Sequence, residues 1–158
     1  MKKLTGIRLI NWHAFQDETI HINNSVLLTG ENGVGKSTIL DAIQFVLTCS
    51  KNNFNKAANE NSKRNLIGYV RYKTGKEDKE YEREGNVSSH VALEFYEELK
   101  NNYFIIGAVI DSSSSTSDPK VLWYRMEGKK LDDIDYINKD NDPLDISSFK
   151  TYIKGLTA

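Results

Sequence analysis

The chain lacks the features that mark secreted or membrane-spanning proteins. Its 158 residues include one cysteine, so no internal disulfide can form, and a reducing cytoplasm fits best. No apolar run approaches the length of a membrane span. Residues 1–15 have a charged start but lack the continuous apolar core and small-residue cleavage site of a signal peptide. We therefore expect a cytoplasmic protein with no membrane partner.

A strong excess of charge is also absent, because the net charge is −1. The charges are nevertheless segregated. Residues 127–145 contain seven acids and three lysines. Residues 51–76 contain a single acid, Glu60, and seven cations: Lys51, Lys56, Lys63, Arg64, Arg71, Lys73 and Lys76. Such a segment is either a surface that faces the DNA backbone or an ordinary solvated loop.

Hydrophobic periodicity predicts an α/β fold in a single domain spanning residues 1–158. Alternating or continuous apolar runs predict strands at 2–12, 18–22 and 25–30. Apolar residues at three- and four-residue spacing predict a helix over 36–47. Residues 50–90 form a long polar, basic excursion, and antiparallel strands follow between 90 and 127. A terminal helix is expected at about 147–156, with Ser147 or Ser148 as its N-cap.

A glycine-rich loop at residues 30–38 carries the most specific chemistry. Gly30, Gly35, Lys36 and Ser37 fit the pattern G-x-x-x-x-G-K-[ST], with a predicted strand before it and a helix after it. The glycines let backbone N–H groups turn toward phosphate oxygens, and the start of the helix adds a positive dipole end. Lys36 can reach the β- and γ-phosphates, and the Ser37 hydroxyl can ligate Mg²⁺. We expect ATP and Mg²⁺ to be bound here, by Gly30, Asn32, Gly33, Val34, Gly35, Lys36, Ser37 and Thr38.

The residues around this loop resemble a known family. "GENGVGKSTILDAIQFVL" resembles the P-loop of SMC-like, ABC-type ATPases, in which G-x-N-G-x-G-K-S/T runs into an Asp-Ala-Ile helix; Asn32, Gly33 and Asp41 match beyond the minimal pattern. Two predicted strands precede the loop strand, which differs from the order usual in small-molecule kinases and GTPases. Residues 56–75 are similar to the same region of the MukB-like ATPase subunit of Wadjet-type plasmid-defence systems. The resemblance covers most of residues 4–110.

The resemblance implies the N-terminal half of an ABC-type P-loop ATPase head, with a mixed sheet whose antiparallel strands surround the P-loop helix. After residue 48 no hydrophobic run ends in Asp-Glu and no "LSGG" segment occurs, so the resemblance places the activating acid in a C-terminal half. It implies ATP hydrolysis only when that half is present, with no catalytic residue in this fragment. The implied partners are that C-terminal half, a second head in an ATP-dependent dimer, kleisin-type and accessory subunits, and DNA. The full-length chain would carry a coiled coil.

Three hypotheses about function follow from these features. The first is an ATP-driven DNA-organising motor in an anti-plasmid or antiviral defence complex. The second is a nucleotide-gated dimerisation module with little turnover, and the third is an unrelated P-loop phosphotransferase. Arg64 and Arg71 lie where the family has an arginine that approaches nucleotide or DNA, although solvated loop arginines fit the sequence equally well. His13 lies where the family's first strand turns near the adenine, but an ordinary surface or hydrogen-bonded histidine is the favoured interpretation. Trp12 beside it is expected to pack in the core.

Overall fold

The computed structural model describes residues 1–22, 33–51 and 65–157. The elements within those ranges are, in chain order, β1 (Lys2–Trp12), β2 (Phe15–His21), α1 (Gly33–Thr48), α2 (Leu66–Arg71), β3 (Val87–Glu97), β4 (Asn102–Ser112), β5 (Lys120–Glu127), the 3₁₀ turn η2 (Leu131–Asp133) and α3 (Ile146–Thr157). Of the predicted site residues, Gly30, Asn32 and Arg64 lie outside the described ranges, as does the strand predicted at 25–30.

The five described strands form one sheet in the order β2-β1-β3-β4-β5, and every neighbouring pair is antiparallel. β1 lies between β2 and β3, so the N-terminal strand occupies an interior position with partners on both sides. The antiparallel run predicted at 90–127 is confirmed and begins slightly earlier, at Val87. The expected mixed sheet is not seen among the described strands, which contain no parallel pair.

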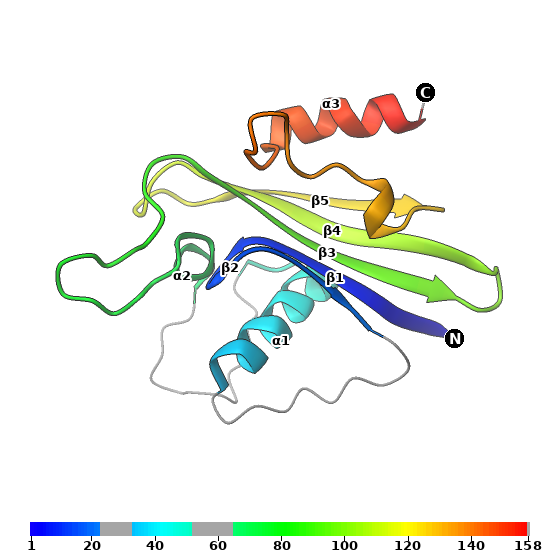
Figure 1. The fold of residues 1–158 in the computed structure, drawn as a ribbon, viewed down its shortest axis with the longest axis horizontal. Coiled ribbons are helices and arrows are strands. Elements are labelled where there is room, and N and C mark those ends of the chain that lie inside the picture. The colour runs from blue at the N-terminus through cyan, green and yellow to red at the C-terminus, as the bar shows by residue number, and fades with distance from the viewer. Residues whose placement is uncertain (23–32, 52–64, 158) are drawn as a thin grey trace.

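Helices cover both faces of the sheet, with α1 on one side and α3 on the other (Figure 1). Because side chains alternate along a strand, neighbouring residues of β3 enter different cores. Val91 and Leu93 pack in the core beneath α1, whereas Ala92 packs in the core beneath α3. The two cores share the sheet and are otherwise built from different helices.

The predicted P-loop helix is confirmed, but it begins at Gly33, three residues earlier than the apolar pattern indicated. Glycines hide this first turn from a pattern search because they carry no side chain for periodicity to register. The helix buries Ala42, Phe45 and Val46 against the sheet. Its position under β3 and β4 is therefore fixed by its apolar face rather than by its glycine-rich start.

Among its described residues, the polar excursion contains a short helix, α2, that the sequence did not predict. Asn65 caps it, because its side-chain oxygen accepts the Gly68 N–H at 2.7 Å. Tyr72 ends it in the left-handed conformation, with φ of 58°. Leu66, Tyr69 and Val70 are buried in the core beneath α1. The excursion is thus anchored to the sheet through α2.

The terminal helix is confirmed as α3, but its predicted cap is wrong. Asp145 is the N-cap, because its carboxylate accepts the Ser148 N–H at 2.8 Å. Phe149 is fully buried, and Ile153 and Leu156 pack at the edge of the same core. In the part of the chain that the structure describes, no helix is both long and apolar enough to cross a membrane.

Candidate functional site

The N-terminal turn of α1 supplies the backbone chemistry of the candidate site. The first four N–H groups of an α-helix have no partner within the helix, and in α1 they begin at Gly33. No acidic residue lies in this first turn, so the positive end of the helix dipole is not neutralised by the helix itself. These N–H groups and the dipole together favour an anion such as a phosphate.

Three described side-chain positions surround this turn. Lys36 is exposed, as a residue that neutralises an incoming phosphate must be, whereas Ser37 and Thr38 are buried at 8% and 3% exposure. Gly35 is also exposed, and a Cβ added there would meet no described atom within 4 Å. Packing within the described protein therefore does not require a glycine at position 35. Only the backbone of Gly33 and Val34 is described, as part of α1.

Two aromatic side chains hold α1 near this turn. The Trp12 indole N–H donates to the Thr38 carbonyl oxygen at 3.0 Å, in a buried position. The Tyr69 hydroxyl from α2 donates to the carboxylate of Asp41, which is fully buried. The rings of Trp12 and Tyr69 are stacked, with centroids 4.7 Å apart and planes 3° from parallel. Core packing of Trp12 was predicted, but the role of Tyr69 was not.

The turn between β1 and β2 adjoins α2. Asn11 and His13 both have left-handed backbone conformations, with φ of 50° and 51°, which is uncommon for residues other than glycine. The His13 N–H donates to the Tyr69 carbonyl oxygen at 2.6 Å, and its ring centroid lies 4.7 Å from that of Tyr72. His13 is thus held at the turn by contacts with α2 and with Tyr72.

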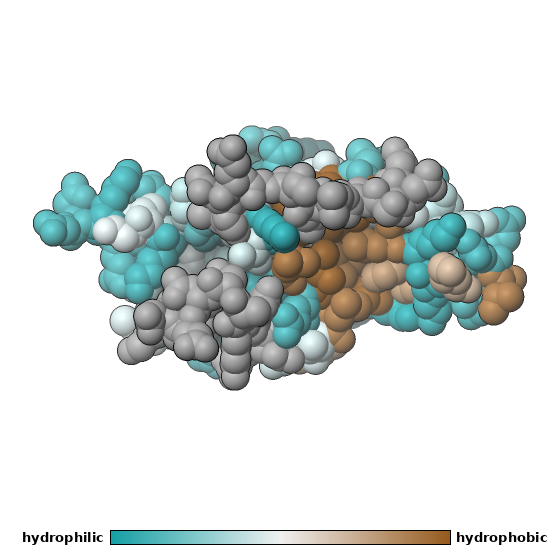
Figure 2. All heavy atoms as spheres, turned by 90° about the horizontal axis from the view of Figure 1, so that it is seen from below, coloured by the Kyte–Doolittle hydropathy of each residue, from teal (hydrophilic) through white to brown (hydrophobic). Residues whose placement is uncertain are grey.

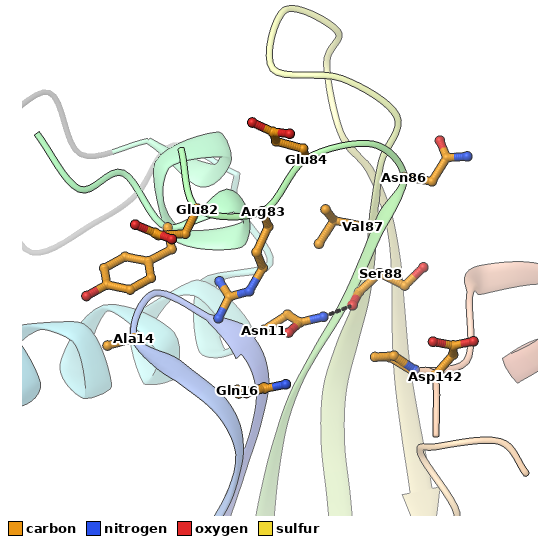
Figure 3. A pocket seen from close by; sticks show the side chains of 12 residues that line it. Asn11, Ala14, Gln16, Glu82, Arg83, Glu84, Asn86, Val87, Ser88 and Asp142 are labelled. Carbon is orange, nitrogen blue, oxygen red and sulfur yellow. Dashed lines mark hydrogen bonds between the residues drawn. The ribbon is translucent and has the colours of Figure 1, made fainter. Parts of the chain in front are cut away.

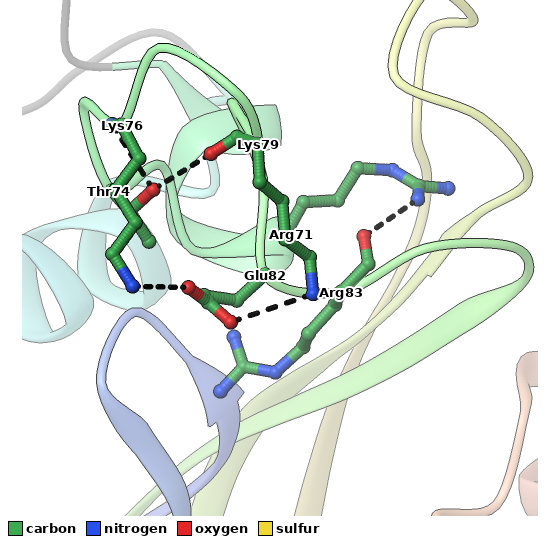
Figure 4. Close-up of polar contacts among 6 residues, drawn as sticks. All are labelled: Arg71, Thr74, Lys76, Lys79, Glu82 and Arg83. Atoms are coloured by element: carbon green, nitrogen blue, oxygen red, sulfur yellow. Dashed lines mark hydrogen bonds and ion pairs between the residues drawn. The ribbon is translucent and has the colours of Figure 1, made fainter.

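Arg71 is neither a solvated arginine nor one that is available to a ligand. It is 2% exposed, and its guanidinium donates to Ser112 and to the carbonyl oxygens of Arg83 (3.1 Å) and Gly85 (2.6 Å). Figure 4 shows Arg71 reaching the main chain beside Arg83. Burial lowers the pKa of Arg71 from its usual value. Its donors hold residues 83–85 against the end of β4, which is a structural role.

Arg83 fastens the same segment to the β1–β2 turn. Its guanidinium donates to the carbonyl oxygens of Val70 (3.1 Å) and Phe15 (3.2 Å). Its own backbone N–H donates to the Arg71 carbonyl oxygen at 2.9 Å. Arg71 and Arg83 therefore connect α2, the β1–β2 turn and the β3–β4 end of the sheet.

The described cations of the basic segment are engaged within the protein. Lys51 contacts Asp118 and donates to the Pro119 carbonyl oxygen at 2.6 Å, and Arg71 is buried. Two lysines at the end of the segment form ion pairs with acids that follow it, at distances of 3.5–3.7 Å: Lys73 with Glu80 and Lys76 with Glu82. Figure 4 shows Glu82 between Lys76 and Lys79. Exposed pairs of this kind are weak, but they reduce the field that a polyanion meets. The other three cations, Lys56, Lys63 and Arg64, lie outside the described residues.

A cleft of about 750 Å³ opens beside the β1–β2 turn (Figure 3). It is lined from that turn, from residues 82–88 and from residues 142–143, and none of its lining residues belongs to α1. Among the described residues that line it, the acids are Glu82, Glu84 and Asp142, and the cation is Arg83, which donates to main-chain carbonyls. The cleft therefore has the wrong charge for phosphate and is separate from the candidate site on α1.

The face that carries α1 also keeps apolar surface beyond the helix. Figure 2 shows this face, with hydrophobic atoms gathered near its middle. Several apolar side chains packed against the core on this side remain partly exposed, namely Leu4, Ile20, Ile22, Phe95, Ile106 and Trp123. The candidate site thus lies on a face of the sheet where the described residues include partly exposed apolar side chains.

Comparison with protein families supports a P-loop here. The model of a family described as the P-loop containing region of an AAA domain matches residues 4–61, which is less than half of the chain. The matched range contains β1, β2, the glycine-rich loop and α1, and it ends before α2. No curated protein matches the chain. The match supports a P-loop ATPase-like domain whose nucleotide-binding region is the one built on α1.

Proposed function

We propose that this chain is the ATP-binding part of an SMC-like, DNA-organising ATPase, the motor of an anti-plasmid or antiviral defence complex. The strongest support for a nucleotide site is the arrangement of residues at the start of α1. There an exposed lysine, an open glycine position and the N–H groups of a helix's first turn come together, within the range that matches a P-loop family. Two strands, β1 and β2, precede this helix, as in the family that the sequence resembles.

In this site each group has a separate task. The N–H groups from Gly33 onward hold phosphate oxygens, and Lys36 neutralises the terminal phosphates. Ser37 provides the hydroxyl that Mg²⁺ favours, and Mg²⁺ when bound would neutralise further charge on the phosphates. His13 and the segment around Arg64 remain candidates for contacts with the rest of the nucleotide.

Hydrolysis also needs a group that orients and activates a water molecule. Asp41 is the one acid of α1, and it is fully buried beneath Tyr69, so it does not serve as that group. We place the activating carboxylate in a C-terminal head half, and completion of the site in a second head. The DNA contact that we propose for the basic segment rests on Lys56, Lys63 and Arg64, because the described cations of that segment are already engaged.

The proposal is tested by removing the lysine. We expect Lys36→Ala to weaken binding of Mg²⁺·ATP at least a hundredfold by calorimetry, because no other described side chain of the first turn carries a positive charge. Lys150→Ala is the matched control, since Lys150 is an exposed lysine on α3, across the sheet. Circular dichroism should show both variants folded. ATP binding that survives in Lys36→Ala would contradict the assignment.

A further inference from the structure

The contact between Tyr69 and Asp41 joins two elements that are separate in the sequence. Asp41 lies in the third turn of α1, four residues after Ser37, so both residues lie on the same side of the helix. Tyr69 comes from α2, beyond the residues that match the P-loop family. The Tyr69 hydroxyl therefore links α1, which carries the candidate site, to α2, which lies outside the range of the family match.

We propose that Tyr69 is a positioning residue for the nucleotide site. Its hydroxyl, bonded to Asp41, sets the rotation of α1 about its axis and so the place where Lys36 and Ser37 meet the phosphates. The inference rests on the proposed function, because it concerns that same site. It adds a specific residue outside the P-loop on which nucleotide affinity depends.

Tyr69 itself is held rigidly, which is what a positioning residue requires. Its ring stacks on Trp12, whose indole N–H donates to the Thr38 carbonyl oxygen in the second turn of α1. Its main-chain carbonyl accepts the His13 N–H from the β1–β2 turn. Trp12 and Tyr69 therefore contact successive turns of α1 from one stacked pair, and the sheet supports that pair.

The hydroxyl matters separately from the ring. A phenylalanine at position 69 would keep the stack on Trp12 and most of the apolar burial, but it would leave the Asp41 carboxylate without this donor. A hydrogen bond to a charged group is worth more than one between neutral groups, and burial raises the cost of losing it. The carboxylate would then turn toward other donors, and α1 would rotate with it.

The test compares two tyrosine hydroxyls, one on each face of the sheet. Tyr69→Phe should weaken Mg²⁺·ATP binding about tenfold, as loss of a charged hydrogen bond predicts. Tyr136→Phe makes the same chemical change at a residue that is 2% exposed beneath α3, and it should change affinity less than twofold. Melting temperatures are measured for both, so that affinity is separated from stability. Equal affinity in Tyr69→Phe and the unmodified chain, or equal losses in both variants, would overturn the inference.

A second pair of variants keeps the inference testable if Tyr69→Phe does not fold. Asp41→Asn retains an oxygen that accepts from the Tyr69 hydroxyl and should bind Mg²⁺·ATP nearly as well as the unmodified chain. Asp41→Ala removes the acceptor and should lose about tenfold. If Asp41→Asn binds as poorly as Asp41→Ala, or if none of these variants folds, the contact serves stability alone and the inference is wrong. Lys36→Ala in the same series distinguishes the two failures, because undiminished binding there overturns the proposed function itself.

Discussion

The two faces of the sheet use aromatic residues for different purposes. Beneath α1, Trp12 and Tyr69 form polar contacts with the helix through an indole N–H and a hydroxyl, and that helix begins in an open, glycine-rich turn. Beneath α3, a cluster of rings closes around the imidazole of His90, with Tyr136 and Phe149 at 5.2–5.3 Å. On the α1 face the aromatic side chains bond to the helix that carries the candidate site. On the α3 face they pack around a buried histidine.

The buried histidine shows how closed the α3 face is. The His90 imidazole is 0% exposed, and its Nε2–H donates to the Leu144 carbonyl oxygen at 2.7 Å. Within the described ranges its Nδ1 has no hydrogen-bond partner, so a proton added there would be a buried, unpaired charge. Burial therefore lowers the pKa of His90 to about 4. The group is held neutral and contributes packing rather than acid–base chemistry.

The largest expected effect is on the free energy of unfolding, when a large buried side chain is removed from one core at a time. Phe45 and Phe149 are both 0% exposed, one beneath α1 and the other beneath α3. Replacing either by alanine should lower the free energy of unfolding by about 3–5 kcal/mol, which chemical denaturation measures. Only Phe45→Ala should also weaken Mg²⁺·ATP binding by the folded protein, because Phe45 stacks on Trp12 at 5.5 Å. Equal affinity losses in both variants would erase the distinction between the two faces.

The next effect is a dependence of stability on pH that belongs to the α3 face alone. His90 has a pKa of about 4 when folded, against 6.5 for an ordinary histidine. As pH falls from 6.5 to 4, His90 is therefore protonated in the unfolded chain but stays neutral in the folded chain. The free energy of unfolding should drop by about 3 kcal/mol over that window from this group, and the group contributes no pH dependence above it.

The control for this prediction compares two histidines. His90→Gln should flatten the pH dependence of the urea midpoint between pH 4 and pH 6.5, whereas His21→Gln, at an exposed position on β2, should leave it unchanged. Carboxylates titrate in the same range in all three proteins, so the difference between the curves isolates His90. A curve for His90→Gln that coincides with that of the unmodified chain would show that the imidazole is not held neutral.

The smallest effect concerns the start of α3. Asp145→Ala removes the N-cap and should lower the free energy of unfolding by about 1 kcal/mol. The hydrogen bonds from Ser148 hold the pKa of Asp145 below its usual value, so the contribution of the cap should fade as the carboxylate becomes protonated in acid. Ser147→Ala is the matched control and should cost less, and nucleotide affinity should be unchanged in both. A larger loss in Ser147→Ala would restore the serine cap that the sequence suggested.

Periodicity was enough to predict the main elements, because each has a long apolar stripe. β1, β3, β4 and β5, and the apolar faces of α1 and α3, follow directly from spacing. The short helix α2 was missed although Leu66, Tyr69 and Val70 are spaced three and four residues apart, because one and a half turns carry too weak a pattern beside lysines and asparagines. The cap of α3 was misplaced because serine and aspartate both cap helices, and only the observed hydrogen bond selects Asp145.

The candidate site was predictable where its chemistry depends on the local sequence, as at Lys36 and Ser37. It was not predictable where a side chain acts across the fold. From the sequence, Arg71 was predicted either to be solvated or to contact nucleotide or DNA. In the structure it is buried and donates to the carbonyl oxygens of residues 83, 85 and 112. The contact of Tyr69 with Asp41 spans 28 residues and includes no pattern that spacing reveals. Long-range polar contacts of this kind appear only after the chain is folded.

The central claim is that nucleotide binds at the start of α1 and leaves the α3 face untouched. Hydrogen–deuterium exchange with and without Mg²⁺·ATP tests it directly, because phosphates that accept hydrogen bonds from the N–H groups of the first turn slow the exchange of those groups. We predict that peptides covering residues 33–38 become protected while those covering 146–157 do not change. Absence of protection at residues 33–38 at saturating nucleotide, or protection confined to α3, would contradict the account.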